Sequence, residues 1–330
     1  MAAYILRRLL LAIVTILAIT VITFVIIQLP PGDFVDAYVA QASAMGSAIS
    51  AEEAQALRVA YGLDQPVWVQ YGKWLGLMVT GNFGQAFEYG RPVKEVIGDR
   101  LWLTILISVA ALMLTWLIAL PIGIYSAVRQ YSVGDYIFTF VGFIGLAVPN
   151  FLLALIVMYF SFKLFDANVG GLFSAEYQLA PWSWGKAWDL AKHMPLPAVI
   201  LALAGTAQLI RIMRANLLDE LRKPYVVTAR ARGLPERRVI LKYPVRAALN
   251  PFASTIGYLL PFVVSGSIIV SVVLSLPTVG PLLLRALVAQ DMLLASTIIL
   301  LLGVLTVVGT FISDLLLMWI DPRIRQGMHG

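Results

Sequence analysis

Cysteine is absent from this 330-residue chain, and only two histidines, His193 and His329, are present. Without cysteine the chain has no disulfide scaffold, no thiol nucleophile and no thiolate metal site. Two histidines are too few for a histidine-based metal cluster. We therefore expect no metal site, no cofactor-binding residue and no catalytic residue in this chain.

Charged residues are also scarce, at 13% of the chain, whereas hydrophobic residues make up 60%. Globular proteins carry about 25% charged residues, so this composition is typical of a membrane protein. The formal net charge of +6 fits cytosolic loops rich in Lys and Arg. That explanation is favoured over binding to nucleic acid.

Six apolar runs predict six transmembrane helices, because each is close to the roughly 20 residues needed to cross a bilayer. The runs are residues 9–29, the stretches between Arg100 and Arg129 and between Asp135 and Lys163, a short run over 194–211, and residues 251–276 and 292–320. The first run is longer than the apolar core of a signal peptide, so we expect an uncleaved helix. The predicted fold class is an all-α membrane protein.

The distribution of Lys and Arg predicts the orientation of these helices. Basic residues gather in segment 211–250, before the first run and in the C-terminal tail. Six spans place these three regions on one side, so both termini are expected in the cytosol. The predicted organisation is an N-terminal transmembrane helix (1–29), an external segment (30–100), a five-helix transmembrane core (101–320) that contains a cytosolic loop (219–250), and a cytosolic tail (321–330). Within the external segment, residues 51–61 are predicted to form a helix capped by Ser50.

The cytosolic loop predicts a short helix followed by a second one. Pro224 suits the first turn of a helix, and residues 225–232 contain no helix breaker. Gly233 provides a stop, and Leu234-Pro235 prevents continuation. The second helix is expected to start at Pro235 and to run into the fifth span, so that the pair forms a rigid lever.

The side chains of the short helix suit contact with another protein. Ala229 and Ala231 keep the surface low, so a groove on a partner can approach closely. Tyr225 and Thr228 offer polar anchors. Arg230 and Arg232 can pair with carboxylates of the partner.

The sequence from Tyr225 to Leu234, Tyr-Val-Val-Thr-Ala-Arg-Ala-Arg-Gly-Leu, resembles the cytosolic loop of dipeptide/oligopeptide ABC importer permeases. The resemblance extends to Leu29-Pro30-Pro31-Gly32-Asp33, to Tyr61–Pro66 with Val69-Gln70-Tyr71, and to Ser313-Asp314 followed by Asp321–Arg325. It implies a type I ABC importer permease fold, and it identifies the chain as the first of two related permeases. The residues implied for the ATPase-coupling loop are Tyr225, Thr228, Ala229, Arg230, Ala231, Arg232, Gly233 and Leu234.

The resemblance also implies the partners. They are a second homologous permease subunit, two ABC ATPase subunits and an extracytoplasmic solute-binding protein. ATP and Mg are expected in the ATPases, because this chain lacks a phosphate-binding G-x-x-x-x-G-K-[ST] loop. Gly72-Lys73-Trp74 and Gly185-Lys186-Ala187 lack both the hydroxyl residue and the upstream glycine.

Six polar residues in or near the spans are candidates for the pathway or a gate. Polar groups within a membrane mark substrate paths, but they also snorkel, pair locally or join helices by hydrogen bonds. Both explanations remain open at this point for Asn150, Gln208, Arg211, Arg214, Ser271 and Asp314.

The substrate class is also open. The turn after the fifth span reads Pro277-Thr278-Val279-Gly280 with Ser271 before it, whereas many peptide permeases have an acidic residue and Pro-Gly-Leu-Gly there. Oligosaccharides, glutathione, opines and metal chelates are therefore alternatives to peptides.

An ion-coupled secondary transporter is a rival of another class, but paired repeats and midplane carboxylates are not evident. An intramembrane enzyme would need a catalytic dyad, which the sequence does not offer.

Overall fold

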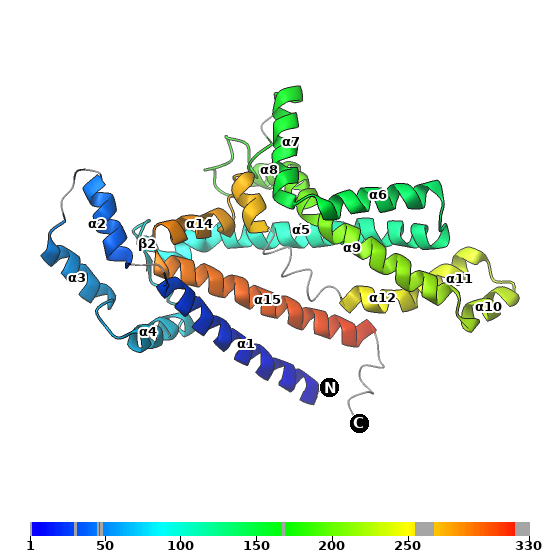
Figure 1. Cartoon of the computed structure of the whole chain (residues 1–330), viewed down its shortest axis with the longest axis horizontal. Helices are drawn as coiled ribbons and strands as arrows, with labels where there is room; N and C mark the ends of the chain where they lie inside the picture. Colours follow the sequence, from blue (N-terminus) through cyan, green and yellow to red (C-terminus); the bar gives the residue numbers. More distant parts are fainter. Residues whose placement is uncertain are drawn as a thin grey trace. The chain divides into compact units, whose positions relative to one another are not determined.

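The computed structural model of the chain describes residues 2–29, 32–44, 46, 49–166, 169–254 and 267–320. This part of the chain is mostly helical (Figure 1). The elements before residue 130 are α1 (Ala2–Gln28), α2 (Phe34–Ala44), α3 (Ala51–Tyr61), α4 (Val67–Val79), β1 (Gln85–Ala86), β2 (Arg91–Pro92) and α5 (Val93–Val128). Those that follow are α6 (Val133–Ala147), α7 (Asn150–Phe165), α8 (Trp184–His193), α9 (Pro195–Leu221), α10 (Pro224–Ala231), α11 (Glu236–Lys242), α12 (Pro244–Ser254), α14 (Val279–Val288) and α15 (Met292–Ile320).

Four helices of the described chain are long and apolar enough to cross a membrane. They are α5, α9, residues Ile5–Ile26 of α1 and residues Met292–Leu315 of α15. The pair α6 and α7 adds a fifth span if it crosses as one unit. The all-α membrane class is therefore confirmed. Residues 255–266 of the expected fifth run, and the expected tail, residues 321–330, lie outside the described residues.

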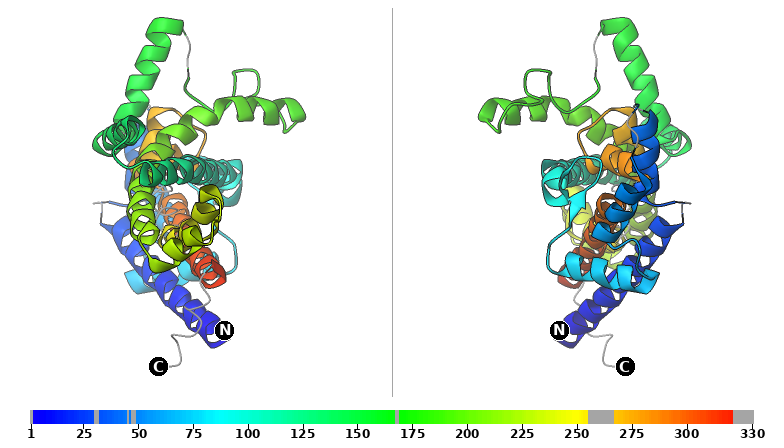
Figure 2. Two further views of the ribbon diagram at one scale, coloured as in Figure 1. Left: turned by 90° about the vertical axis from the view of Figure 1, so that its right-hand side faces the viewer. Right: turned by 90° about the vertical axis from the view of Figure 1, so that its left-hand side faces the viewer.

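The third apolar run is not one straight helix. It forms α6 and α7, which meet at an angle of 102° (Figure 2). Val148 is extended, with φ −91° and ψ 120°, and Pro149 follows it. A residue before proline is driven out of the helical region by the proline ring. The prediction of a continuous span between Asp135 and Lys163 is therefore wrong at this point.

The described chain divides into two compact units. The first contains residues 104–277 and the part of the chain from residue 308 onward, and the second contains residues 2–103 and 278–307. Helices α5 and α15 each contribute residues to both units.

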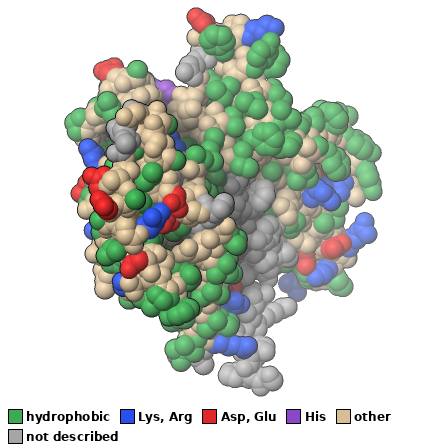
Figure 3. All heavy atoms as spheres, turned by 60° about the vertical axis from the view of Figure 1, so that its left-hand side comes forward, with side chains coloured by type: hydrophobic (Ala, Val, Ile, Leu, Met, Phe, Trp, Pro, Cys, Tyr) green, Lys and Arg blue, Asp and Glu red, His purple; other side chains and the backbone are tan. Residues whose placement is uncertain are grey.

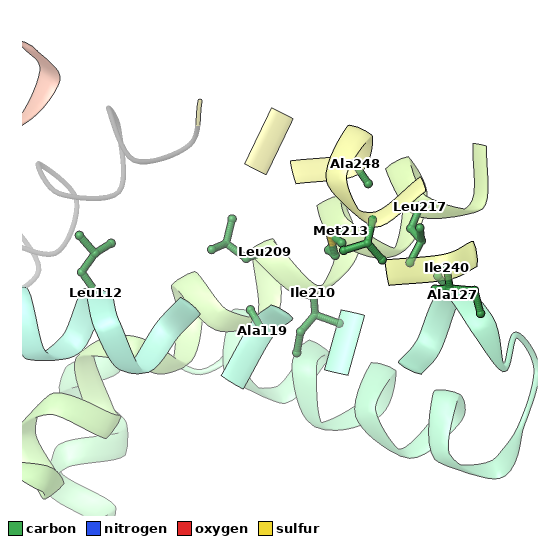
Figure 4. Close-up of a cluster of buried hydrophobic side chains, with 10 residues drawn as sticks. Leu112, Ala119, Ala127, Leu209, Ile210, Met213, Leu217, Ile240 and Ala248 are labelled. Carbon is green, nitrogen blue, oxygen red and sulfur yellow. The ribbon is translucent and has the colours of Figure 1, made fainter. Parts of the chain in front are cut away.

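The core of the first unit lies where α5, α9, α11 and α12 pack together (Figure 4). Its buried members are Leu112, Ala119, Ala127, Leu209, Ile210, Met213, Leu217, Ile240, Val245 and Ala248. Helices α5 and α9 approach closely at Gly123, where an added Cβ would lie 2.7 Å from Cβ of Met213. A small residue at this position is what permits such close helix packing in a membrane.

The second unit combines the N-terminal part of the chain with the first half of α15. Trp74 of α4 is buried against α1 and α15, and its indole Nε1 donates a hydrogen bond to Oγ of Ser296 at 2.9 Å. A side chain on Gly303 would lie 2.9 Å from Ile19, so α1 and α15 also pack closely. Apolar contacts and side-chain hydrogen bonds therefore hold α4 against these two helices.

Helix α3 confirms the expected helix over 51–61. Ser50 accepts a hydrogen bond from the Glu53 amide, and the Glu53 carboxylate accepts one from the Ser50 amide, which makes a capping box. Arg58 of α3 forms ion pairs with Asp33 and Asp36. In Figure 3, which turns the side of the molecule with α2 and α3 forward, acidic and basic groups lie among hydrophobic side chains.

Candidate functional site

The segment between α9 and α12 forms a compact helical module of α10, α11 and their connection. Helix α10 begins at Pro224, which supplies a fixed φ and needs no amide partner in the first turn. It ends before Gly233, which has φ +74°. Glycine adopts this left-handed conformation without strain, so it suits the sharp exit. The predicted short helix and its stop are confirmed.

A small apolar cluster holds α10 against α11. Val226, Ala229 and Val239 are buried, and Leu234 and Tyr243 pack around them. Burial of one such aliphatic side chain stabilises a fold by about 1.5–3 kcal/mol. The module is therefore a folded element with its own packing and not an extended loop.

Ile240, the residue after Val239 on α11, faces the core of the first unit. Ile240 packs with α5, α9 and α12, whereas its neighbour Val239 packs with α10. Helix α11 thus lies between α10 and the helices that span the membrane (Figure 1). Packed side chains therefore connect α10 to these helices.

The second predicted helix is broken in two. Helix α11 ends at Lys242 and α12 starts at Pro244, while Tyr243 between them has φ −110° and ψ −78°. Proline has no amide hydrogen and its ring clashes with the preceding turn, so it interrupts a helix. The expectation of one rigid lever from Pro235 into the fifth span is wrong, because the connection has a joint at Tyr243.

One face of α10 is open. Pro224, Val227, Thr228 and Ala231 are exposed, and their spacing of three, four and seven residues places them on one side of the helix. Ala231 therefore lies on the outer face of α10, as expected for a small residue that lets a partner approach closely. Ala229 was expected on this face too, but it is only 6% exposed and packs against α11. Its small size serves the packing of the module.

Arg230 and Tyr225, which were expected to contact a partner protein, both form hydrogen bonds within the chain. Arg230 donates to Glu236 through Nε at 3.1 Å and Nη2 at 2.6 Å. This hydrogen bond to Arg230 lowers the pKa of Glu236. Tyr225 donates to the Glu220 carboxylate at 2.5 Å. Burial, and then this hydrogen bond, raise the pKa of Tyr225, so it is a neutral phenol at physiological pH.

Thr228 and Arg232 differ in what they offer to a partner. The hydroxyl of Thr228 donates to the carbonyl of Pro224 at 3.0 Å within α10. Arg232 is exposed, and its guanidinium makes no hydrogen bond or ion pair with the rest of the described chain. Of the two arginines expected to meet carboxylates of a partner, Arg232 is the one whose charge is not already paired.

The candidate pathway residues fall into separate places of the first unit. Gln208, Arg211 and Arg214 line one cavity between α6 and α9. Asn150 lines a second cavity, together with Pro149, Ala204 and Ile269. Ser271 is buried, and Asp314 is half-buried on α15.

The sequence reasoning missed the role of Asp135. This residue is 2% exposed and accepts two hydrogen bonds from Arg214, from Nε at 3.0 Å and Nη2 at 2.9 Å. Its position at the start of an apolar run was used only to mark the boundary of that run. The signal that could have revealed the pair is that Asp135 marks the start of one apolar run, while Arg214 lies three residues beyond Arg211 at the end of the next run.

Comparison with known proteins gives two matching families. Residues 119–326 match the binding-protein-dependent transport system inner membrane component family, and residues 1–110 match its N-terminal component. The chain is 39% identical to the oligopeptide transport system permease protein AppB of Bacillus subtilis, over 98% of this chain and all of that protein. It is 37% identical to a putative peptide permease protein of Brucella ovis and 30% identical to the dipeptide transport system permease protein DppB of Lactococcus lactis. Each of these two alignments covers 98% of this chain and 99% or more of the relative.

Proposed function

Because this chain belongs to the family of binding-protein-dependent transport system inner membrane components, we propose that it is the first permease subunit of an ATP-driven peptide importer. The chain is a permease of the cell (inner or cytoplasmic) membrane. The expected membership of the dipeptide/oligopeptide permease family is confirmed. A peptide substrate is supported by the names of the relatives, which are oligopeptide, dipeptide and putative peptide permeases.

The observation that carries this proposal is the α10 module. Its outer face is exposed, its inner face is packed on α11, and α11 packs on the helices of the core. A helix with these two faces can receive a force from a partner and pass it to the membrane. We assign the outer face of α10, which comprises Pro224, Val227, Thr228 and Ala231, to contact with an ATPase.

The proposed assembly has this chain beside a second homologous permease, with two ATPases on the cytosolic side and a solute-binding protein outside. The proposed topology is six spans with both termini in the cytosol, which puts α10 on the side of the ATPases. In this proposal ATP and Mg bind to the ATPases, and this chain binds neither.

The proposed mechanism is alternating access. The solute-binding protein delivers a peptide to the external mouth between the two permeases. Closure of the ATPases around ATP moves α10, and α11 transmits the motion to α9 and α12, so that the pathway opens outward. Hydrolysis and release of the products reset the pathway toward the cytosol.

The test is affinity purification of the tagged chain from its native membranes in several mild detergents, followed by identification of the proteins retained. We expect a second permease and ATPase subunits, together with a solute-binding protein when peptide is present. A monomer or homodimer without an ATPase in every detergent would contradict the proposal.

A further inference from the structure

A cavity of about 650 Å³ lies between α6 and α9 in the first unit. The two helices run antiparallel, because Asp135 pairs with Arg214 near one end and Gly145 contacts Leu203 near the other. The polar residues that line the cavity are Tyr131, Asp135, Tyr136, Thr139, Gln208, Arg211 and Arg214. A polar cavity between two apolar helices is unusual in a membrane, where polar groups mark functional positions.

The charges in this cavity do not cancel. The Asp135 carboxylate is matched by Arg214, and it also accepts a hydrogen bond from the Tyr131 amide at 2.9 Å. The guanidinium of Arg211 makes no hydrogen bond or ion pair with any residue that the structure describes. The cavity therefore carries one uncompensated positive charge, which favours an anionic ligand.

The side chain of Arg211 extends along the cavity and away from the ion pair. Its guanidinium carbon lies 5.9 Å from the centre of the Phe143 ring, which is eight residues beyond Asp135 on α6. A snorkelling arginine would instead extend toward the end of the helix, where the headgroups lie. Contact with Phe143 therefore places the exposed guanidinium of Arg211 along the wall of the cavity.

Two further polar side chains lie beside Arg211 without a hydrogen-bond partner in the described chain. Gln208 is one turn earlier on the same face of α9, and Thr139 faces the cavity from α6. An amide and a hydroxyl can both donate to a carboxylate oxygen. Guanidinium groups bind planar carboxylates with two parallel hydrogen bonds.

We propose that this cavity binds a carboxylate group of the transported substrate, with Arg211 as the anion-binding residue and Gln208 and Thr139 as flanking donors. This inference depends on the proposed function, because a peptide carries a carboxylate at its C-terminus. The cavity is then one binding site along the pathway, and it favours peptides that have a free C-terminal carboxylate.

The chain has no cysteine, so Gln208→Cys places a single reactive thiol in this subunit. The assembled transporter is treated with an anionic and a neutral methanethiosulfonate reagent of similar size, and modification of this chain is measured by mass. We expect the anionic reagent to react about tenfold faster than the neutral one, because Arg211 attracts it. Arg211→Gln should abolish the preference, and the control Arg222→Gln, which changes an exposed arginine after the end of α9, should leave it intact.

The second arm uses a peptide and its C-terminal amide, each added directly at high concentration so that selection by the solute-binding protein does not contribute. The free acid should protect the thiol at about tenfold lower concentration than the amide. Equal protection by both, or no preference for the anionic reagent at position 208, would overturn the inference. Protection that depends on added phospholipid and not on peptide would assign the cavity to a lipid headgroup and would also overturn it. Peptide uptake by the transporter without substitutions is measured in parallel, so the proposed function is tested separately from the carboxylate site.

Discussion

At the scale of single residues, Gly233 determines where α10 ends. Its φ of +74° lies in the left-handed region, and an added Cβ would meet no atom within 4 Å. The effect of a substitution is therefore conformational and not steric.

Gly233→Ala should destabilise the α10–α11 module by roughly 1–2 kcal/mol, because the left-handed conformation is unfavourable for alanine. Gly233→Asn should cost less, because asparagine tolerates this conformation better. Hydrogen exchange of the α10 amides measures the difference. Equal exchange in the two variants would contradict the assigned role of the backbone at this position.

Ala229 and Ala231 lie two positions apart but face opposite environments. Ala231→Leu adds bulk to the outer face, so we expect normal insertion and thermal stability but about tenfold lower peptide-stimulated ATP hydrolysis. Ala229→Leu overpacks the contact with α11, at a cost of about 1–3 kcal/mol, and should lower the thermal stability of the protein. Serine at each position is the matched control, since it adds one atom.

The contrast between these two variants distinguishes docking from packing. If Ala231→Leu lowers thermal stability as much as Ala229→Leu does, the outer face is not free as described. If Ala231→Leu retains full peptide-stimulated hydrolysis, that face does not contact the ATPase at this position.

At the scale of elements, local patterns predicted most of what the structure contains. The prolines, glycines and polar caps at Ser50, Pro224 and Gly233 mark helix boundaries that depend on nearby backbone groups. The joint at Pro149 was missed because an apolar run looks the same whether it is straight or bent. The joint before Pro244 was missed because the second helix was expected to continue from Pro235 into the fifth span. The inward direction of Ala229 was missed for another reason, since it depends on packing between α10 and α11.

The candidate pathway residues show the same limit. Gln208, Arg211 and Arg214 share one helix face, so their common cavity follows from helical spacing. The partner of Arg214 comes from Asp135, which lies 79 residues earlier in the chain. Such a pairing depends on the tertiary contact between α6 and α9 and has no local signature.

The start of α15 is attached to the β1–β2 segment by one buried carboxylate. Asp291 is 0% exposed and accepts hydrogen bonds from the amides of Leu294 at 3.1 Å and Glu88 at 3.2 Å. Burial raises the pKa of Asp291 to about 6, from an ordinary value of 3.8. The folded protein therefore holds this proton more tightly than the unfolded chain does.

This shift predicts a pH dependence of stability. Protonation of Asp291 contributes about 3 kcal/mol to the free energy of unfolding. This contribution is fully present below pH 3.8 and is lost as the pH rises through about 6. Asp291→Asn cannot titrate, so thermal unfolding between pH 4 and 7 should show a smaller decrease with rising pH than in the unmodified chain. The control is Glu88→Gln, which removes a neighbouring negative charge and should move the transition to lower pH. An unchanged pH profile in Asp291→Asn would contradict this account.

At the scale of the whole molecule, the chain joins the α10–α11 module to an apolar core that has few charges. The module has one packed face and one open face, and α11 connects it to α5, α9 and α12. In the proposed function, a partner supplies the movement that this module receives. The central claim is therefore that the open face of α10 contacts an ATPase.

Site-specific photo-crosslinking tests this claim most directly. A photoreactive phenylalanine analogue replaces Val227, which is 58% exposed on the open face of α10, or the control Val67, which is 54% exposed at the start of α4. After irradiation of native membranes, the account predicts a covalent adduct with an ATPase subunit from position 227 and none from position 67. Absence of an ATPase adduct at position 227 in a correctly inserted protein, or an equal adduct from both positions, would contradict it.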